Sequence, residues 1–352
     1  MASRLLIYGA NGYTGRLVCD EALRRGLDPI VAGRNGAEIG ELARRLGVEH
    51  RVFSLEGPST VDACLDGVDV VIHCAGPFSR TAMPMAEGCL RTHTHYLDVT
   101  GEVDVFERLA SRSSEAALAG VMWMPGVGFD VVPSDCLAVH AASRSGKGAS
   151  GRVLRLAILG AGIMSHGTAT TMIENLHKGG LVRRGGALVP VRAGSVTRRF
   201  DFGRGEKLAM AVPWGDLATA YRSTGIGDIE TYFAASGSMV WGARAAGFVP
   251  WLMKAKAVQG MLKRRVEARP AGPSEEQRKN SRSIIVAEVE GPTGTVRSRL
   301  TTPNGYTLTA LASVEIARRV LAGEYRPGFQ TPAQMYGADF VLGLQGVSRE
   351  DL

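Results

Sequence analysis

Residues 5–16 read LLIYGANGYTGR, and this stretch decides the fold of the first part of the chain. A short apolar run of strand type is followed by three glycines, Gly9, Gly12 and Gly15, and then by an amphipathic segment. Gly9 permits a tight turn, Gly12 lets backbone N–H groups approach a pyrophosphate, and Gly15 permits close packing of a helix on the strand. The stretch therefore predicts a strand, a phosphate-binding loop and a helix whose N-terminus attracts an anion.

Outward from this loop, short β-branched runs alternate with amphipathic segments. Such alternation is typical of a parallel sheet with helices on both faces, so we predict an N-terminal Rossmann-type doubly wound domain over residues 1–135. The predicted strands are Leu5–Tyr8, Pro29–Ala32, His50–Ser54, Val68–Cys74, Tyr96–Val99 and Val121–Met124. The predicted helices are Arg16–Arg25, Gly36–Leu46, Ser59–Leu65, Met83–Arg91 and Val103–Ala119.

The later part of the chain has a different pattern. A length of 352 residues exceeds what one hydrophobic core usually serves, so about two domains are expected. From Arg152 onward, longer strand-like runs are set among fewer helices, and a turn at Gly291–Gly294 joins two of them as an antiparallel pair. We therefore predict a second, α+β domain over residues 136–324, built on a mixed sheet, for the substrate and for a homodimer contact.

The basic net charge, +7, raises the question of a polyanionic partner. The arginines are spread over many predicted helices, whereas nucleic-acid binding calls for a concentrated basic stripe. We therefore expect a small polyanionic molecule as the partner and no nucleic acid.

The cysteines and the first residues bear on location. The five cysteines form no CxxC pair, and their odd number opposes a disulfide framework. Met1–Arg4 runs straight into the first strand and leaves no room for a signal peptide. The expected location is the cytoplasm.

One long apolar stretch, Gly237–Met253, requires an interpretation. Arg244 interrupts it and Pro250 breaks a helix, so it falls short of a transmembrane segment. We expect a buried helix in preference to a lipid-facing one, and a peripheral membrane contact is the alternative.

Cofactor preference is predicted at the end of the second strand. An acidic residue at this point would bind the ribose 2′-hydroxyl of NAD, but the sequence there is Ala32-Gly33-Arg34-Asn35. Arg34 stands 19 residues after Gly15, near the expected offset of about 20. A guanidinium can hold a 2′-phosphate with two parallel hydrogen bonds, so NADP(H) is the predicted cofactor.

Three later strand ends carry turn or polar residues, at 74–78, 95–102 and 125–135. Ligands of open α/β sheets collect at this edge. In the first of them, Phe78 could pack beside the nicotinamide or in the core, and both interpretations stay open.

Hydride transfer is carried out by the cofactor, so the protein mainly positions the substrate and supplies a proton. The titratable candidates are Tyr96, Asp98, Asp130 and His166. A lone histidine or aspartate at a helix start is often only a cap, so no single one of them is preferred. We expect no metal site, because the histidine pair at 93 and 95 has no ligands in a recognised spacing.

These segments together resemble the saccharopine dehydrogenase-like oxidoreductases. Their motifs occur here in order: G-A-N-G-Y-T-G, A-G-R, G-P-F, Y-x-D-x-x-G-E and G-F-D-x-x-P-S-D, over about Leu5–Asp135, and the tail Pro327–Leu342 matches more loosely. The resemblance implies that residues 325–352 pack back onto the first domain. It also implies NADP(H) contacts at Gly9, Asn11, Gly12, Tyr13, Thr14, Gly15, Arg34, Ala75, Gly76, Pro77 and Phe78.

The resemblance leaves the substrate open, since relatives include saccharopine reductases and trans-acting enoyl reductases. The apolar character of the second domain favours reduction of a C=C or C=N bond in a small or acyl-type substrate. A saccharopine-type amino-acid reductase is the alternative, and arginines that could bind its carboxylates are Arg183, Arg184, Arg192, Arg198 and Arg199. A non-catalytic NADP(H)-binding sensor or a lipid-associated protein is an alternative of another class.

Overall fold

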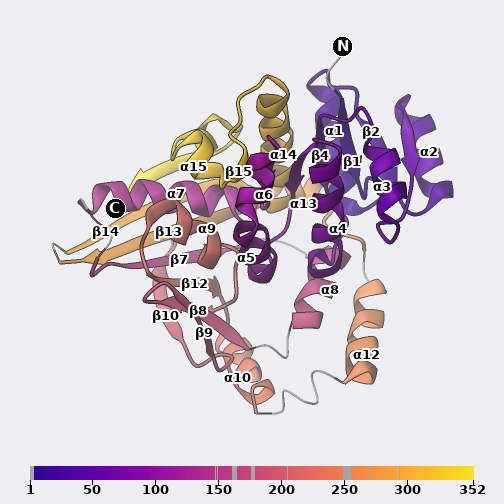
Figure 1. Ribbon diagram of the computed structural model, residues 1–352. Coiled ribbons are helices and arrows are strands. Elements are labelled where there is room, and N and C mark those ends of the chain that lie inside the picture. Colours follow the sequence, from indigo (N-terminus) through magenta and orange to yellow (C-terminus); the bar gives the residue numbers. More distant parts are fainter. Residues whose placement is uncertain are drawn as a thin grey trace. The chain divides into compact units, whose positions relative to one another are not determined.

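The computed structural model describes residues 4–146, 148, 150–160, 165–175, 179–203, 205–248, 255–268, 270–292 and 294–352 (Figure 1). The chain divides into two compact units. Unit 1 comprises Met1–Val132 and Tyr306–Met335, and unit 2 comprises Pro133–Gly305 and Tyr336–Leu352.

Unit 1 is built on a seven-stranded sheet in the order β15-β6-β5-β4-β1-β2-β3, and every pairing in it is parallel. The strands are β1 (Leu5–Tyr8), β2 (Ile30–Gly33), β3 (His50–Val52), β4 (Val70–His73), β5 (His95–Asp98), β6 (Met122–Met124) and β15 (Gly328–Phe329). The order of β1 to β6 is that of a doubly wound dinucleotide-binding sheet, which confirms the predicted fold class. Strands β1, β2 and β4 are entirely buried, because helices cover both faces of such a sheet.

The helices of unit 1 follow the predicted alternation. They are α1 (Tyr13–Arg24), α2 (Gly36–Leu46), α3 (Pro58–Leu65), α4 (Phe78–Arg91), α5 (Val103–Ser111) and α6 (Ser113–Leu118), with α14 (Gly305–Leu321) added from the C-terminal part. The single helix predicted for Val103–Ala119 is wrong, because the chain leaves helical geometry at Arg112. Helix α14 is tied to Arg25, the C-cap residue of α1, by an ion pair of 2.6 Å with Glu315.

Unit 2 contains a nine-stranded mixed sheet, which confirms the predicted α+β architecture. Its main path runs β10-β11-β12-β7-β13-β14-β16, and β8 and β9 attach to β12. Only the β12–β7 pairing is parallel among those of the described strands. The strands are β7 (Val153–Leu159), β8 (Gly180–Arg184), β9 (Ala187–Val191), β10 (Thr197–Asp201), β11 (Glu206–Ala211), β12 (Asp228–Ala234), β13 (Arg282–Gly291), β14 (Gly294–Pro303) and β16 (Ser348–Asp351).

The helices of the rest of the chain connect and flank these strands. They are α7 (Val132–Arg144), α8 (His166–Asn175), α9 (Asp216–Thr224), α10 (Gly237–Ala246), α12 (Lys256–Glu267), α13 (Glu275–Asn280) and α15 (Pro332–Tyr336), with a 3₁₀ helix at Phe340–Gly343. Ser274 is the N-cap of α13 and forms a reciprocal capping box with Gln277.

The C-terminal part divides differently from the predicted boundary at residue 324. Residues 306–335 belong to unit 1, where β15 extends the sheet beside β6, whereas residues 336–352 belong to unit 2. The last strand, β16, pairs with the edge strand β14 through hydrogen-bonded neighbours such as Ser348 and Thr301. An open sheet edge can recruit a short polar strand that has no hydrophobic pattern of its own, so the sequence does not reveal this pairing.

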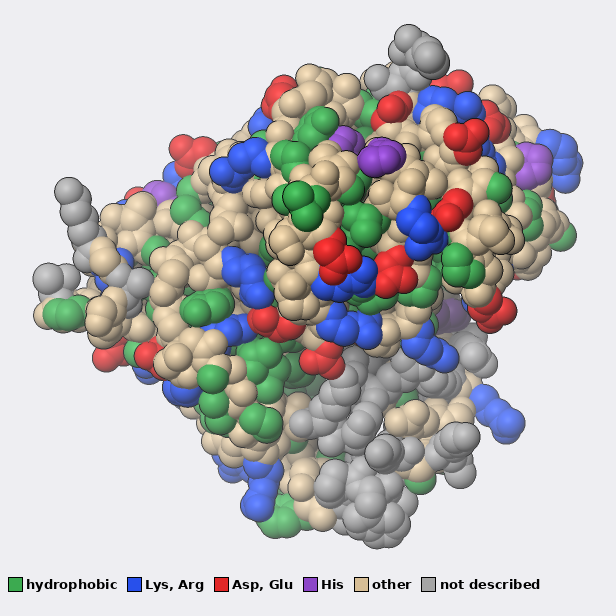
Figure 2. All heavy atoms as spheres, in the orientation of Figure 1, with side chains coloured by type: hydrophobic (Ala, Val, Ile, Leu, Met, Phe, Trp, Pro, Cys, Tyr) green, Lys and Arg blue, Asp and Glu red, His purple; other side chains and the backbone are tan. Residues whose placement is uncertain are grey.

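The apolar stretch Gly237–Met253 is not a buried helix in its described part. Helix α10 ends at Ala246, and Val240 is its only buried residue, whereas Trp241 is 73% exposed. Residues 249–253 of the stretch lie outside the described residues. Among the described helices, none is long and apolar enough to cross a membrane. On the face drawn in Figure 2, Lys and Arg side chains lie among Asp and Glu side chains.

Candidate functional site

The loop between β1 and α1 has the backbone geometry of a phosphate-binding turn. Gly9 has a φ of +79°, and a Cβ atom placed there would lie 2.8 Å from the side chain of Ala75. At Gly15 a Cβ would lie 2.2 Å from the carbonyl oxygen of Gly9, so only glycine lets the helix start this close to the strand. Gly12 is the N-cap of α1, and its N–H donates to the Gly9 carbonyl at 3.0 Å.

The N-terminus of α1 is suited to an anion. Within the described residues no side chain caps this helix end, and its first turn contains no acidic residue. Tyr13 and Thr14 open the helix, and the Tyr13 ring packs edge-on against Tyr306 at a centroid distance of 5.1 Å. The N–H groups of this turn therefore point at the space in front of the loop.

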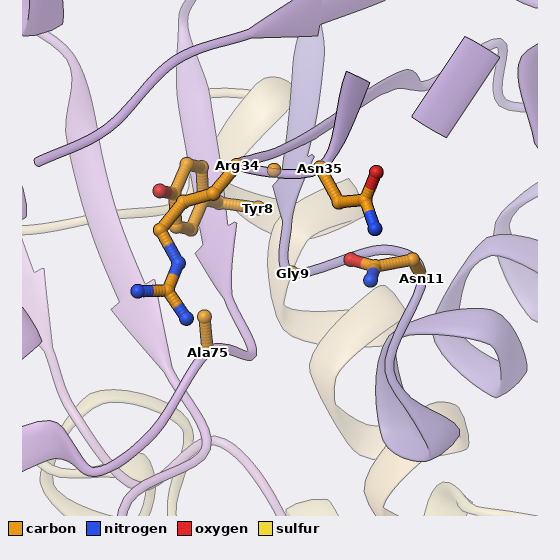
Figure 3. A pocket seen from close by; sticks show the side chains of 7 residues that line it. Tyr8, Gly9, Asn11, Arg34, Asn35 and Ala75 are labelled. Atoms are coloured by element: carbon orange, nitrogen blue, oxygen red, sulfur yellow. The ribbon is translucent and has the colours of Figure 1, made fainter. Parts of the chain in front are cut away.

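A cavity of about 270 Å³ lies in front of this loop, where β1, β2 and β4 end. Its lining consists of Tyr8, Gly9, Asn11, Gly33, Arg34, Asn35 and Ala75 (Figure 3). The Arg34 side chain reaches over Tyr8 toward Ala75, while Asn11 and Asn35 lie on the other side of Gly9. Among the described residues, the Arg34 guanidinium makes no hydrogen bond or ion pair. An anionic ligand in the cavity would therefore meet a cation that no carboxylate has neutralised.

Glu38, in the first turn of α2, is a residue of this site that sequence reasoning missed. Its carboxylate accepts one hydrogen bond from the amide of Asn11, at 2.8 Å, and one from the amide of Asn35, at 2.6 Å. Glu38 thereby fixes two of the side chains that line the cavity. Its position four residues after Arg34 could not have revealed this role, because the carboxylate binds the two asparagines and not a ribose hydroxyl.

The turn after β4 is held by Glu102. This carboxylate accepts hydrogen bonds from the backbone N–H groups of Phe78, at 2.9 Å, and Ser79, at 3.0 Å. Glu102 thus occupies the N-terminus of α4, where a negative charge is favourable. Among the predicted cofactor residues of this turn, Ala75 lines the cavity, whereas Gly76 and Pro77, joined by a cis peptide bond, and Phe78 do not.

A buried histidine lies behind this turn. His73 is fully buried, and its ring contacts those of Tyr8, at 5.4 Å, and Phe78, at 5.3 Å. Neither ring nitrogen has a hydrogen-bond partner among the described residues. Burial lowers the pKa of His73 to about 3, so the imidazole is neutral. The Phe78 ring therefore packs against a buried residue on one side, which favours a core role for part of this ring.

Tyr96 and Asp98 are brought together at the end of β5, and both are fully buried. The Tyr96 hydroxyl donates to Asp98 at 2.6 Å, and the same carboxylate accepts from the N–H groups of Thr100 and Gly126, each at 2.9 Å. Burial raises the pKa of Asp98 to about 6, although these hydrogen bonds act in the opposite direction. Burial also raises the pKa of Tyr96 well above 10. This arrangement joins the ends of β5 and β6.

The other two candidate acids lie in different units. Asp130 belongs to unit 1 and retains partial exposure, and its Oδ2 would lie 2.8 Å from a Cβ at Gly101, after the end of β5. Burial raises the pKa of Asp130 to about 6. His166 belongs to unit 2, where it begins α8 and its N–H donates to the carbonyl of Ala271. Of the four candidates, Tyr96, Asp98 and Asp130 therefore come together near the ends of β5 and β6. Among the described residues, no group of acids, histidines and cysteines could hold a metal ion.

The sheet order, the glycine loop and the cavity with its free cation define unit 1 as a dinucleotide-binding domain of Rossmann type. Residues 5–124 match the family model for the saccharopine dehydrogenase NADP-binding domain. This match to the first part of the chain confirms the resemblance seen in the sequence and NADP as the cofactor.

Comparisons with individual proteins extend over different lengths. The chain is 33% identical over 140 residues to a trans-acting enoyl reductase of Mycobacterium leprae, covering 37% of this chain and 33% of that protein. It is 28% identical over 151 residues to the human saccharopine dehydrogenase-like oxidoreductase, covering 37% and 35%. These matches span about a third of the length of the relatives. Over the whole of both chains, the fold is similar to that of saccharopine dehydrogenase (L-Glu forming) from Saccharomyces cerevisiae, with a TM-score of 0.65 and 14% identity.

Proposed function

We propose that this chain is an NADP(H)-dependent oxidoreductase of the saccharopine dehydrogenase-like type that reduces a C=C or C=N bond in an acyl-type substrate. The observation that carries the nucleotide part is the Arg34 guanidinium, which faces the cavity with no carboxylate partner among the described residues. A 2′-phosphate is the group of NADP that such a cation recognises.

The residues of unit 1 fit this cofactor. The pyrophosphate would meet Gly9, Asn11, Gly12, Tyr13, Thr14 and Gly15, and the adenosine end would meet Arg34. Ala75, Gly76, Pro77 and Phe78 would bound the nicotinamide side of the loop. When bound, NADPH supplies the hydride. The chain itself has to orient the substrate and provide a proton.

Asp130 is our preferred proton donor. An acid whose pKa is raised to about 6 holds its proton near neutral pH far better than an ordinary aspartate, and Asp130 is the partly exposed member of the candidates near the ends of β5 and β6. Tyr96 and Asp98 are fully buried and bind each other, which favours a positioning role for both. His166 stays a second candidate for the proton donor.

The substrate preference rests on partly exposed apolar side chains in unit 2. Trp214 and Phe233 are stacked with a centroid distance of 6.1 Å and an interplanar angle of 16°, and both keep partial exposure. Leu159 and Ile284, paired across β7 and β13, are likewise only partly buried. Surfaces of this kind bind an acyl chain better than a molecule with several carboxylates.

Three of the five arginines that would serve a saccharopine-type substrate already have hydrogen-bond or ion-pair partners within the chain. Arg184 forms an ion pair with Glu230, and Arg198 forms one with Glu288 at 3.1 Å. Arg183 donates to the carbonyl oxygens of Leu217 and Gly186. A guanidinium bound in this way offers fewer donors to a substrate carboxylate, so the amino-acid reductase is the weaker alternative.

Turnover tests this proposal. Purified protein would be mixed with NADPH and either enoyl thioesters of increasing chain length or keto acids with amines, and oxidation followed at the nicotinamide absorbance. We expect oxidation with enoyl thioesters and little with keto acid and amine. Oxidation with keto acid and amine alone would instead support the saccharopine-type reductase. NADPH binding without turnover on either panel would support a sensor. The five cysteines are all free, in keeping with the cytoplasmic location that we propose.

A further inference from the structure

Helix α10 of unit 2 presents a partly aromatic face to solvent, and Arg244 is the only exposed charged residue among those described in this helix. Val240 is 5% exposed and the Arg244 Nε donates to the Gly194 carbonyl at 2.8 Å, so the side that carries these two residues faces the rest of the unit. The opposite side exposes Met239 to 50% and Trp241 to 73%. The outward residues of a surface helix are normally polar. Here the exposed residues are Gly237, Ser238, Met239, Trp241, Gly242, Arg244 and Ala245, and most of them are apolar or small.

Further exposed apolar side chains follow α10 along the chain. Phe248 is 68% exposed, and the Arg192 guanidinium carbon lies 4.7 Å from the centroid of its ring. In α12, Met261 is 50% exposed and stands one turn before Arg264 and Arg265, which are both exposed. Large exposed apolar side chains grouped in one segment are characteristic of an interaction surface.

The charge of this segment is one-sided. No Asp or Glu occurs between residues 231 and 266, although six Lys or Arg residues do. Over the whole chain, in contrast, 41 basic residues are nearly balanced by 34 acidic ones. A partner that fits this segment must therefore be apolar inside and anionic at its surface.

We propose that α10, Phe248 and the exposed side of α12 form a docking surface for an anionic phospholipid bilayer. Trp and Phe side chains favour the level of the headgroups, and neighbouring Lys and Arg side chains are attracted to anionic lipids. A second copy of this chain fits less well, since its identical segment would bring the same positive charge into contact. The surface would hold the protein at the membrane without a spanning segment.

Co-sedimentation with vesicles tests the docking surface. The full chain would be mixed with vesicles of phosphatidylcholine and phosphatidylserine in equal parts, and with vesicles of phosphatidylcholine alone. We expect at least about tenfold more binding to the anionic vesicles, weakening as salt is raised. The double variant Trp241→Ser, Phe248→Ser should reduce the partition coefficient about tenfold. The double variant Arg264→Glu, Arg265→Glu should remove most of the preference for anionic lipid.

Controls separate docking from damage to the fold. Leu118→Ser changes an apolar side chain that is 89% exposed in unit 1, and it should sediment like the wild type. NADPH affinity and the thermal unfolding midpoint should be unchanged in all variants. The proposal is overturned if the wild type does not bind anionic vesicles at low salt, or if the Trp241 and Phe248 double variant binds as well as the wild type. If the wild type binds no vesicles but forms a dimer in light scattering, and the Trp241 and Phe248 double variant is monomeric, the surface is a contact with a second copy of the chain instead.

Discussion

Replacement of Arg34 gives the sharpest test of the nucleotide site. The guanidinium faces the cavity beside Tyr8 and Ala75 and has no ion-pair partner among the described residues, so its removal leaves no carboxylate unpaired. The measured change therefore reports the contact with the ligand. Hydrogen bonds to charged groups contribute about 1.5–3 kcal/mol, which corresponds to roughly 10- to 150-fold in Kd.

We expect the wild type to bind NADPH much more tightly than NADH. Arg34→Ala should weaken NADPH binding by the factor just given and leave NADH binding nearly unchanged, because NADH lacks the 2′-phosphate. Arg34→Asp should narrow or reverse the preference, since a carboxylate repels the phosphate and can accept a hydrogen bond from the ribose 2′-hydroxyl. Titration calorimetry on protein stripped of bound nucleotide measures the affinities of the wild type and both variants for NADPH and for NADH.

Arg44→Ala is a matched control, because Arg44 is an exposed arginine of the neighbouring helix α2 and does not line the cavity. It should leave both affinities unchanged. Equal affinities of the wild type for the two nucleotides would refute the assignment of Arg34, as would an Arg34→Ala variant that loses NADPH and NADH affinity in the same proportion.

Three further substitutions probe the residues around the cavity and the strand ends. Glu38→Ala removes the carboxylate that accepts from the Asn11 and Asn35 amides. Calorimetry should therefore show the binding of both nucleotides weakened by a similar factor, about 0.5–1.5 kcal/mol for each hydrogen bond lost, with the preference for NADPH intact. Burial raises the pKa of Asp98 from 3.8 to about 6, so burying its charge destabilises the fold above pH 6, and this cost is relieved as the pH falls from 6 toward 3.8. Over that interval, denaturant unfolding should show the free energy of unfolding of the wild type rising by up to about 3 kcal/mol relative to Asp98→Asn. A difference that stays constant with pH would contradict the raised pKa. Asp130→Asn should lower kcat about 10²- to 10⁴-fold with NADPH affinity unchanged, and should abolish the fall in wild-type kcat as the pH rises through about 6; an unaltered pH profile would point to another donor.

Local patterns in the sequence were sufficient to predict much of unit 1. The β1 loop, the alternation of short strands with helices, and Arg34 are encoded within a few residues of one another, so turn chemistry and periodicity suffice to find them. Glu38 and Glu102 were not found as parts of the site, because their roles depend on hydrogen bonds to Asn11 and to the start of α4, which only the folded chain brings within reach.

The errors in unit 2 have a different physical cause. Hydropathy alone cannot separate a buried helix from one whose apolar side faces solvent, and so α10 was expected in the core although Trp241 is exposed. Strands β8, β9, β11 and β12 were not predicted, because their short runs mix apolar residues with charged residues or a proline and resemble loops. The pairing of β16 depends on an open edge of β14, which no local pattern reveals.

The carboxylate of Glu102 at the start of α4 has a consequence for the direction in which a nucleotide enters. The N-termini of α1 and α4 lie at the carboxyl edge of the sheet, after β1 and β4. The Glu102 carboxylate already neutralises the partial positive charge at the start of α4. Phosphate groups are thereby repelled from one half of the edge and drawn to the other. The phosphates of a bound dinucleotide would therefore lie at the β1 side of this edge, and this sets the orientation of the molecule before either of its bases is recognised.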